Sequence, residues 1–369
     1  MAKGKRDGLL IAGGGLAGCL AAIAVARARP EIPLLLVEEG ESFGGSHIWP
    51  FYDEDVAAED RWLVEPMIAK AWQGYYVAFP GQSRKFRAGY NSVRSADLDA
   101  AVRATLRPDQ YRLGTKVVAV RDNELVLLGG EKIKADGALD ARGAANLSML
   151  ELGWRKFVGR EFIFAQPHKV DRPVLMDATV EQLDGFRFFQ CLPFNETRML
   201  IEDCYYSDTS DLPADAAERL DAYIRLRGWK KRRMQREESG ALPIALGGDF
   251  GAFWRVGGAR VAKLGLRGGF FHPTTGYTLP DAVRTAVMLT QQRDLTGAAL
   301  HDLFEQEAAA LWRKREAYRA FNAALFHAPA QDRRGIFESF YALDPALISR
   351  FHSGSLGMLD RMKLTKLGR

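Results

Sequence analysis

The sequence feature that most constrains the fold is a run of small and apolar residues near the N-terminus, Gly8-Leu-Leu-Ile-Ala-Gly-Gly-Gly-Leu-Ala-Gly18. It predicts a short buried strand that passes through a glycine turn into an alanine-rich helix. The spacing is Gly13-x-Gly15-x-x-Gly18, which provides a tight turn, close backbone approach to a pyrophosphate, and close packing of helix on strand. Free N–H groups and the helix dipole favour phosphate at this helix start. The run therefore predicts a dinucleotide site.

A second apolar segment supports this interpretation. Residues 34–37 predict another buried strand, and Glu38 follows it, 20 positions after Gly18. A carboxylate at this distance hydrogen-bonds the adenosine ribose in such folds. The competing interpretation is a secretory signal peptide or a membrane span, because residues 8–26 carry no charge and basic residues precede them. Three consecutive glycines are unfavourable in either, so the ordered series of strand, turn, helix, strand and acid favours the nucleotide site.

Composition bounds the partners and the compartment. The 369 residues include 51 Lys and Arg and 46 Asp and Glu, and the net charge of +5 suits an anionic membrane surface at least as well as nucleic acid. No nucleic-acid motif is apparent, so we expect no nucleic-acid partner. Cys19, Cys191 and Cys204 have no CxxC or metal-ligand spacing, and the six histidines are scattered. We therefore expect a reducing cytoplasm, no disulfide framework and no metal site.

The rest of the chain alternates between helical and strand patterns. Helices are predicted over 98–106, with 95–97 as the N-cap region, and over 214–227, 281–293 and much of 297–369. Strands are predicted as a pair at 111–120 and 124–128, as a short strand at 138–143, and over 161–164, 174–178, 186–190 and 197–206. Residues 240–244 are a short apolar element. The four later strands predict an antiparallel sheet inserted between parts of the nucleotide domain.

Two loops bear on which dinucleotide is bound. The loop after the second strand contains Gly45, His47 and Trp49, and we expect it to cover the cofactor; the alternative is a connecting loop with buried rings. The glycine-rich segment 263–280 is a second cofactor-facing element far downstream, which favours FAD over NAD. Within it, Thr274-Thr-Gly276 precedes a helix whose N-terminus would favour an anionic reduced flavin. The alternative is a glycine-rich turn needed only for folding.

Two adjacent acids, Glu202 and Asp203, lie inside an otherwise apolar strand. Burying both is costly, so at least one should face water, a partner or a cavity. Because strand side chains alternate, the two cannot share a face and cannot form a carboxylate dyad. A carboxyl group in an apolar pocket has a raised pKa and can act as a general acid near neutral pH. The alternative is a surface strand with solvated acids.

The combination of motifs resembles the flavoprotein family of bacterial lycopene beta-cyclases. The resemblance covers nearly the whole chain in the right order and rests on Gly13-x-Gly15-x-x-Gly18, Gly44-Gly-Ser-His-Ile-Trp49, Met176-Asp-Ala-Thr179, Leu200-Ile-Glu-Asp203, Gly240-Ala-Leu-Pro-Ile244 and Phe271-His-Pro-Thr-Thr-Gly-Tyr277. It implies an α/β fold: a Rossmann-type, flavin-hydroxylase-like FAD-binding domain with an inserted antiparallel β-sheet substrate domain and a helical C-terminal region. It also implies a reduced FAD, with NAD(P)H as electron source. The family's catalytic acid falls on Glu202, with Asp203 beside it in the acidic motif.

These expectations assign domains and site residues. The FAD-binding domain comprises 1–80, 111–153 and 256–296, the substrate side comprises 81–110 and the sheet domain 154–255, and the membrane-facing helical region is 297–369. The residues expected at the cofactor are Gly13, Gly15, Leu16, Ala17, Gly18, Glu38, Gly45, His47, Trp49, Val118, Gly143, Gly269, Pro273, Thr275, Gly276 and Tyr277.

The resemblance also implies a reaction, the isomerisation of acyclic lycopene ends to β-ionone rings, by way of γ-carotene to β-carotene. No electrons are consumed, so the flavin would act through charge or acid–base chemistry, and Glu202 would donate or accept the proton. The apolar substrate implies peripheral association with the inner face of the cell membrane, through residues 321–366; the alternative for this segment is an ordinary helical core. Other candidate functions are an FAD-dependent monooxygenase or dehydrogenase and a flavin-free prenyl-lipid carrier.

Overall fold

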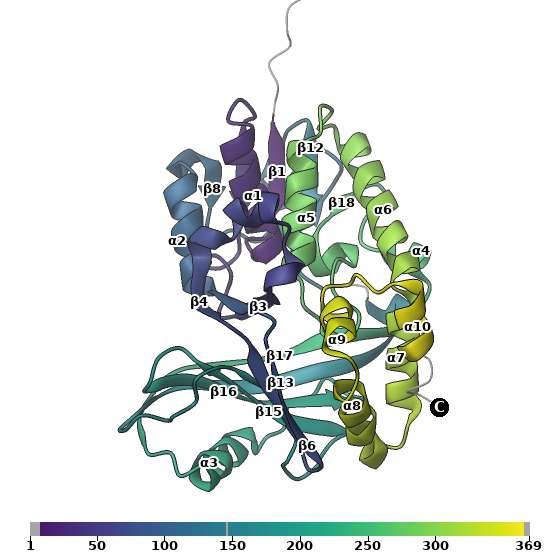
Figure 1. The fold of residues 1–369 in the computed structure, drawn as a ribbon. Helices are drawn as coiled ribbons and strands as arrows, with labels where there is room; N and C mark the ends of the chain where they lie inside the picture. Colours follow the sequence, from purple (N-terminus) through teal and green to yellow (C-terminus); the bar gives the residue numbers. More distant parts are fainter. Residues whose placement is uncertain (1–7, 145–146, 365–369) are drawn as a thin grey trace, which may run out of the picture.

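The computed structural model describes residues 8–144 and 147–364, which form two sheet layers with helices around them (Figure 1). The upper part in Figure 1 holds a parallel sheet flanked by helices, and the lower part holds a larger sheet that lies across it. The C-terminal helices, in yellow, lie along one side of both parts.

Five parallel strands form the upper sheet in the order β18-β12-β1-β2-β8. Their bounds are β1 Leu9–Ala12, β2 Leu34–Val37, β8 Tyr111–Arg112, β12 Gly137–Asp140 and β18 Ala262–Lys263. Helix α1 (Leu16–Ala28) connects β1 to β2, and its first ten residues are all buried against neighbours that include α5 (Leu279–Thr290). The predicted strand, turn, helix and strand are therefore confirmed. Residues 8–26 lack charge because they form this buried core, and none of the described helices is long and apolar enough to cross a membrane.

The segment predicted as one strand over 111–120 is divided between two sheets. Its start is β8, which pairs with β2, and its end is β9 (Val117–Val120), which pairs with β10 (Glu124–Leu127). Gly114 lies between them with φ of +61°, a left-handed conformation that turns the chain. Strand β11 (Lys132–Lys134) completes this small sheet.

Seven strands form the lower sheet in the order β17-β13-β16-β15-β14-β5-β6. Their bounds are β5 Tyr75–Phe79, β6 Gln82–Phe86, β13 Leu150–Phe164, β14 Val174–Asp177, β15 Phe186–Pro193, β16 Arg198–Ser207 and β17 Lys231–Gly248. The apolar element 240–244 is part of the long strand β17. All pairs are antiparallel except β14 with β5, so the sheet is mixed where the sequence predicted an antiparallel one. The difference arises because the hairpin β5–β6, which precedes the inserted region in the chain, adds to the sheet edge.

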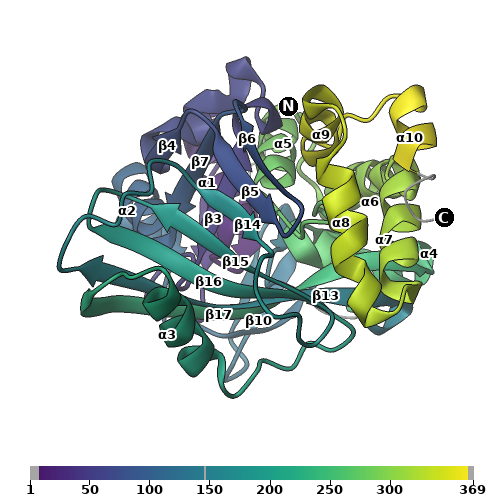
Figure 2. The same ribbon diagram turned by 60° about the horizontal axis from the view of Figure 1, so that its bottom comes forward.

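The two faces of the large sheet pack against different elements (Figure 2). Helix α3 (Ala216–Leu226), which lies in the predicted segment 214–227, covers one face through a core that includes Phe189, Ile201 and Leu220. The other face packs against α7 (Glu316–His327), α8 (Arg333–Tyr341) and α9 (Pro345–His352). Side chains on alternate residues of one strand therefore enter two different cores.

The remaining elements join these layers. Helix α2 (Ser95–Thr105) begins at Ser95, whose side chain binds a loop carbonyl instead of capping the helix. The other bounds are β3 Ile48–Tyr52, β4 Ile68–Trp72 and β7 Tyr90–Arg94, which form a three-stranded sheet, and α4 Phe250–Arg255, α6 Gly297–Lys314 and α10 Met358–Leu364.

A buried ion pair joins α5 to the C-terminal helices. Asp281, which is 1% exposed, accepts two hydrogen bonds from Arg315, at 2.6 and 2.7 Å, and Arg315 also donates to the carbonyl of Phe271 at 3.0 Å. Burial opposes the charge of Asp281, but Arg315 and Arg284 hold the pKa of this carboxyl well below its ordinary value of 3.8.

We expect Asp281→Asn to lower the free energy of unfolding by roughly 3 kcal/mol, because it leaves a buried guanidinium without its counter-charge. The measurement is urea denaturation at neutral pH, with Asp302→Asn on α6 as a control, since that carboxylate is 70% exposed. The deficit should shrink as pH falls below 3.8, where the unfolded chain takes up the proton first. Equal stability of the two variants at neutral pH would contradict this role.

Candidate active site

The glycine turn between β1 and α1 has the geometry that the sequence predicted. Gly13 has φ of +102°, and its N–H donates to the carbonyl of Val37 at 2.8 Å. A Cβ on Gly18 would lie 2.0 Å from the Gly13 oxygen, so only glycine allows α1 to approach the turn this closely. A Cβ on Gly15 would meet nothing within 4 Å, because Gly15 borders open space. The backbone of Gly15 is therefore accessible to a ligand at the start of α1.

Glu38 lies directly after β2 and faces this turn. Its carboxylate accepts hydrogen bonds from the N–H of Gly14 at 2.5 Å and of Gly40 at 2.8 Å. These two bonds fix the carboxylate beside the glycine turn, at the carboxyl edge of the parallel sheet where such folds bind nucleotides.

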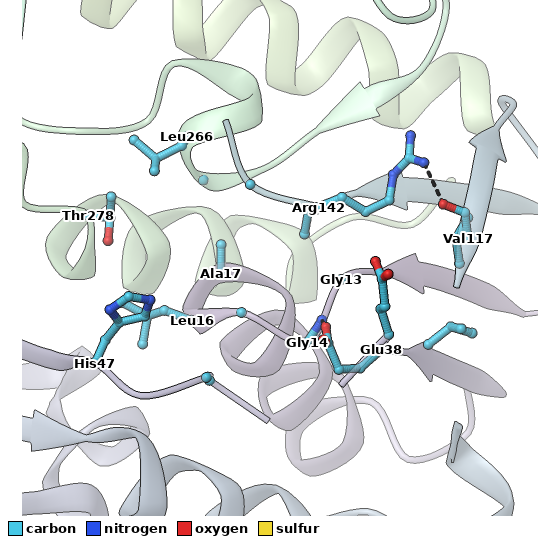
Figure 3. Close-up of a pocket in the computed structure, with 18 of the residues that line it drawn as sticks. Gly13, Gly14, Leu16, Ala17, Glu38, His47, Val117, Arg142, Leu266 and Thr278 are labelled. Atoms are coloured by element: carbon cyan, nitrogen blue, oxygen red, sulfur yellow. Dashed lines mark hydrogen bonds between the residues drawn. The ribbon is translucent and has the colours of Figure 1, made fainter. Parts of the chain in front are cut away.

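A first cavity of about 370 Å³ opens over the glycine turn. Figure 3 shows Glu38 toward one end of it and His47, Leu266 and Thr278 toward the other. Nine of the expected cofactor residues line it: Gly13, Gly15, Leu16, Ala17, Glu38, Gly45, His47, Trp49 and Gly143. The residues that line this cavity come from three separate segments of the chain, 13–49, 115–143 and 265–278.

The expected contact of Val118 needs correction. Val118 is 47% exposed on the outer face of β9, and Val117 lines the cavity in its place. A shift of one residue in a strand moves the side chain to the other face. The carbonyl of Val117 accepts a hydrogen bond from Arg142 at 2.8 Å, which Figure 3 draws.

The loop with His47 and Trp49 forms one wall of the cavity. Gly44 and Gly45 both have positive φ, +78° and +63°, so the loop turns sharply there. The Ser95 hydroxyl donates to the carbonyl of Gly44 at 2.9 Å and accepts from the N–H of His47 at 2.6 Å. This wall is thus fixed by the first residue of α2.

A second cavity of about 160 Å³ adjoins the first, and the two share His47, Trp49, Leu266 and Thr278 as lining residues. Its own walls are mainly apolar and aromatic: Ile48, Pro50, Phe157, Leu192, Leu242, Tyr277 and Leu279. Its polar lining includes Arg155, Gln190 and Glu202. Within residues 8–144 and 147–364, the one carboxylic acid that lines it is Glu202 on β16.

Burial dominates the properties of Glu202, which is 8% exposed. Removal from water, and next the negative charge of Glu238, raise the pKa of Glu202 from 4.5 to about 8, while Arg155 opposes the shift. A carboxyl group with such a pKa is protonated at neutral pH and can donate its proton.

Asp203 is fully buried on the opposite face of β16, away from both cavities. It accepts two hydrogen bonds from Arg187, at 2.8 and 3.0 Å, and one from the Tyr205 hydroxyl at 2.6 Å. The two acids are therefore separated by strand alternation, as expected. The assignment of Asp203 to the catalytic site needs correction, because its side chain lies beneath α3 and is paired with Arg187.

Arg155 on β13 connects the second cavity to the glycine-rich loop. It donates to the Gln190 side chain at 2.9 Å and to the carbonyl of Thr275 at 3.3 Å. Its guanidinium lies 5.3 Å from the centre of the Tyr277 ring. The Tyr277 hydroxyl in turn bonds that of Tyr90 at 2.9 Å. Arg155 and Gln190 were not predicted, because neither belongs to a sequence motif.

The expected residues of the glycine-rich loop are dispersed. Gly276 and Tyr277 line the second cavity. Thr275 lines a separate small space beside Tyr52 and His352, and Gly269 and Pro273 lie on the far side of the loop near Trp312. Positive φ at Gly269 and Gly276, +76° and +72°, folds the loop back on itself, which separates residues that are close in sequence. Gly18 contributes packing of α1 and does not line the cavity.

The parallel sheet, its glycine turn and the large sheet laid across it define a protein of the FAD-dependent monooxygenase fold class. A geranylgeranyl bacteriochlorophyll reductase-like protein from Thermoplasma acidophilum has a similar structure, with TM-score 0.63, 14% identity, and coverage of 98% of this chain and 96% of that one. The flavin-dependent brominase Bmp2 is similar with TM-score 0.59, 14% identity, and coverage of 95% and 94%. These likenesses establish the fold.

Sequence comparison identifies the family. The family model described as lycopene cyclase protein matches residues 8–367. A curated relative, the lycopene beta-cyclase of Pantoea ananas, is 36% identical over 359 residues, which cover 96% of this chain and 93% of the relative. The chain belongs to the lycopene cyclase family.

The raised pKa of Glu202 predicts a specific dependence of stability on pH. Between pH 4.5 and about 8 the folded protein holds a proton that the unfolded chain has lost, so stability falls as pH rises, by up to about 1.4 kcal/mol per pH unit. Glu202→Gln should reduce this slope by the contribution of one proton, as measured by urea denaturation across the range, while Asp55, whose pKa burial also raises to about 8, keeps its own contribution. The control is Glu237→Gln, whose side chain is 46% exposed. Parallel curves for the parent and Glu202→Gln would contradict a buried protonated acid.

Proposed function

We propose that this protein is a lycopene beta-cyclase, which converts the acyclic ends of lycopene to β-ionone rings, by way of γ-carotene to β-carotene, without net oxidation. Membership of the lycopene cyclase family supports this. The observation that carries the proposal is the position of Glu202, a buried acid with a raised pKa in the wall of an apolar cavity that continues into the cavity over the glycine turn.

The proposed reaction is a proton-initiated ring closure. The O–H bond of Glu202 breaks as a C–H bond forms at C2 of the terminal double bond, which leaves a cation at C1. The electrons of C5=C6 then form the C1–C6 bond, and loss of the proton from C6 restores a C5=C6 double bond. One proton enters and one leaves, so the product is an isomer of the substrate.

The cavity around Glu202 suits a cationic intermediate. Phe157, Tyr277 and Trp49 line it, and their ring faces attract positive charge. Leu192, Leu242 and Pro50 exclude water, which would otherwise trap the cation as an alcohol. Phe270 and Phe271, two other rings considered for this role, are 0% and 3% exposed and do not line the cavity.

The residues of the first cavity fit an FAD. The Gly15 backbone is open at the start of α1, and a half-buried carboxylate, Glu38, is fixed by two N–H groups where an adenosine ribose binds in this fold. The flavin end would then lie toward His47, Leu266 and Thr278, which also border the second cavity. When bound and reduced by NAD(P)H, the flavin supplies negative charge beside the substrate.

We expect Glu202→Gln to abolish cyclisation, with a loss of at least about 100-fold, because the amide cannot protonate a double bond. The assay is anaerobic incubation with lycopene, FAD and NADPH, followed by chromatography of γ- and β-carotene. Flavin content measured by absorbance should be unchanged, and Glu237→Gln should keep normal activity. An oxygenated or dehydrogenated product, with one NADPH consumed per turnover, would show that the protein is a redox enzyme and not a cyclase.

We also propose that the protein associates peripherally with the inner face of the cell membrane, since a polyene substrate resides in the bilayer. Met358 and Leu359 on α10 are 81% and 74% exposed, beside Arg361 and Lys363. The ion pair of Asp360 with Arg350, at 2.7 Å, anchors this helix to α9. Exposed apolar side chains beside basic ones are the combination that binds anionic lipid surfaces.

The double substitution Met358→Ser and Leu359→Ser should reduce co-flotation of the protein with anionic liposomes several-fold, because it removes the apolar contact with the acyl region. The matched control is Leu226→Ser on α3, which lies at the lower left of Figure 1 whereas α10 lies at the right, and this side chain is 77% exposed. If the double variant floats as well as the parent, α10 is not the attachment site.

A further inference from the structure

Three neighbouring strands bring a second acid to Glu202. Strand β13 is paired on one side with β16 and on the other with β17. Gly159 of β13 lies opposite Glu202 in one ladder and opposite Glu238 in the other. Because residues directly across a ladder point to the same face, Glu202 and Glu238 flank Gly159 on the face of the sheet that bears the second cavity.

Because Gly159 has no side chain, the side chains of Glu202 and Glu238 can approach each other across it. Its φ is outside the left-handed region, so the backbone itself does not require glycine. A Cβ at this position would lie 2.8 Å from Cγ and 3.3 Å from Oε1 of Glu202, and 3.3 Å from Cγ of Glu238. A glycine inside a long strand weakens it and marks a place where something else approaches closely, which here is the pair of glutamates.

Glu238 is as inaccessible as Glu202, with 4% exposure. Its Oε2 accepts a hydrogen bond from Arg236 at 3.0 Å, whereas its Oε1 is buried and has no fixed donor among the described residues. A buried carboxylate oxygen without a donor is unfavourable, and a proton on the neighbouring carboxyl would supply one. Ionisation of both carboxyl groups at such short range is unfavourable in the absence of a nearby positive charge, because like charges repel, as in the aspartic protease pair.

The surroundings of the pair are unequal. Arg236 binds Glu238, and it is itself held by the carbonyl of Ser46 at 2.9 Å. Glu202 lines the second cavity, and Glu238 does not. The negative charge is therefore best placed on Glu238, against Arg236, and the proton on Glu202, toward the cavity.

We propose that Glu238 is a positioning residue that shares one proton with Glu202 across Gly159 and so keeps Glu202 in its proton-donating form. This inference rests on the proposed function and deepens it, because it names what holds the donor ready. After Glu202 gives its proton to C2, both carboxyls are charged, and the adjacent negative charges stabilise the cation. The proton lost from C6 restores the balance of one proton for the pair.

The pH dependence of the pair also reflects the groups around it. Cys204 faces Glu202 from the same strand. The groups that surround Glu202 from other elements are Arg155 on β13, Arg236 on β17, Tyr90 on β7, Tyr277 before α5 and His47, which also lines the cavity. Arg155 and Arg236 oppose protonation of Glu202, whereas Glu238 and burial favour it.

The test is Glu238→Gln, which keeps the size and hydrogen bonding of the side chain and removes its charge. We expect the high-pH limb of kcat/KM for cyclisation to move down by about one pH unit, since Glu202 then loses its proton more readily. Activity at low pH should return to that of the parent, with KM and flavin content unchanged. A loss that is uniform across pH would indicate a structural role and overturn the proposal.

Infrared spectroscopy of the protein without substrate gives a second readout that does not depend on activity. Because burial also raises the pKa of Asp55 to about 8, the band of Glu202 is read as the difference between the parent and Glu202→Gln. This difference should show the C=O band of a protonated carboxyl at neutral pH, and Glu238→Gln should lose that band at a lower pH than the parent. Gly159→Ala should do the same by separating the acids, while Glu237→Gln should match the parent. If the band titrates identically in Glu238→Gln and the parent, the shared proton is disproved and the role of Glu202 is unaffected. Full activity of Glu202→Gln would instead disprove the proposed function itself.

Discussion

The two-residue period of strand β16 is the constraint on which the rest of the site depends. It directs Glu202 to the cavity face and Asp203 to the face covered by α3, so two adjacent acids have unrelated environments. The period acts together with the register of β13, which is bordered by β16 and β17 over nearly its whole length. A slip of one residue in β16 would place Asp203 in the cavity, and a slip of one residue in β17 would turn Glu238 away from Glu202.

Glu202 differs from three other buried acids in how its burial is balanced. Asp203 is paired with Arg187, Asp281 with Arg315, and Asp140 with Arg142, each by a direct ion pair. The pKa of Asp140 and of Asp281 is lowered by these partners in spite of burial. No ion pair to Glu202 is present within residues 8–144 and 147–364. The adjacent acid, Glu238, raises the pKa of Glu202 further by its negative charge. Arginine thus balances the charge of these three acids, whereas Glu202 at the cavity has its pKa raised to about 8 by burial, as does Asp55, and is neutralised by a proton.

The sequence was sufficient where function depends on local spacing. The Gly13 to Gly18 pattern and Glu38 specify a turn, a helix start and a carboxylate that are close along the chain, and alternation separated Glu202 from Asp203 without any knowledge of the fold. It was insufficient where the contact depends on long-range register. Glu238 is 36 positions from Glu202 in a different strand, and only the pairing of both with Gly159 brings them together. The residue expected at the cavity was Val118, one position from Val117, because composition does not show which face of a short strand is buried. Gly269, Pro273 and Thr275 lie away from the two main cavities because the loop folds back on itself, and composition does not show the path of a loop.

Arg236 links the two cavities through one side chain. A single nitrogen of its guanidinium, Nη1, donates to the carbonyl of Ser46, in the loop that walls the first cavity, and to Glu238. Its Nε lies 3.4 Å from Glu161, which is buried and also paired with Arg94 and Arg198. The wall of the first cavity and Glu238 therefore share Arg236 as one support, and Glu161 pairs with Arg236 from the other side. Since an arginine keeps its charge at any physiological pH, Arg236 stays positive over the pH range in which Glu202 titrates.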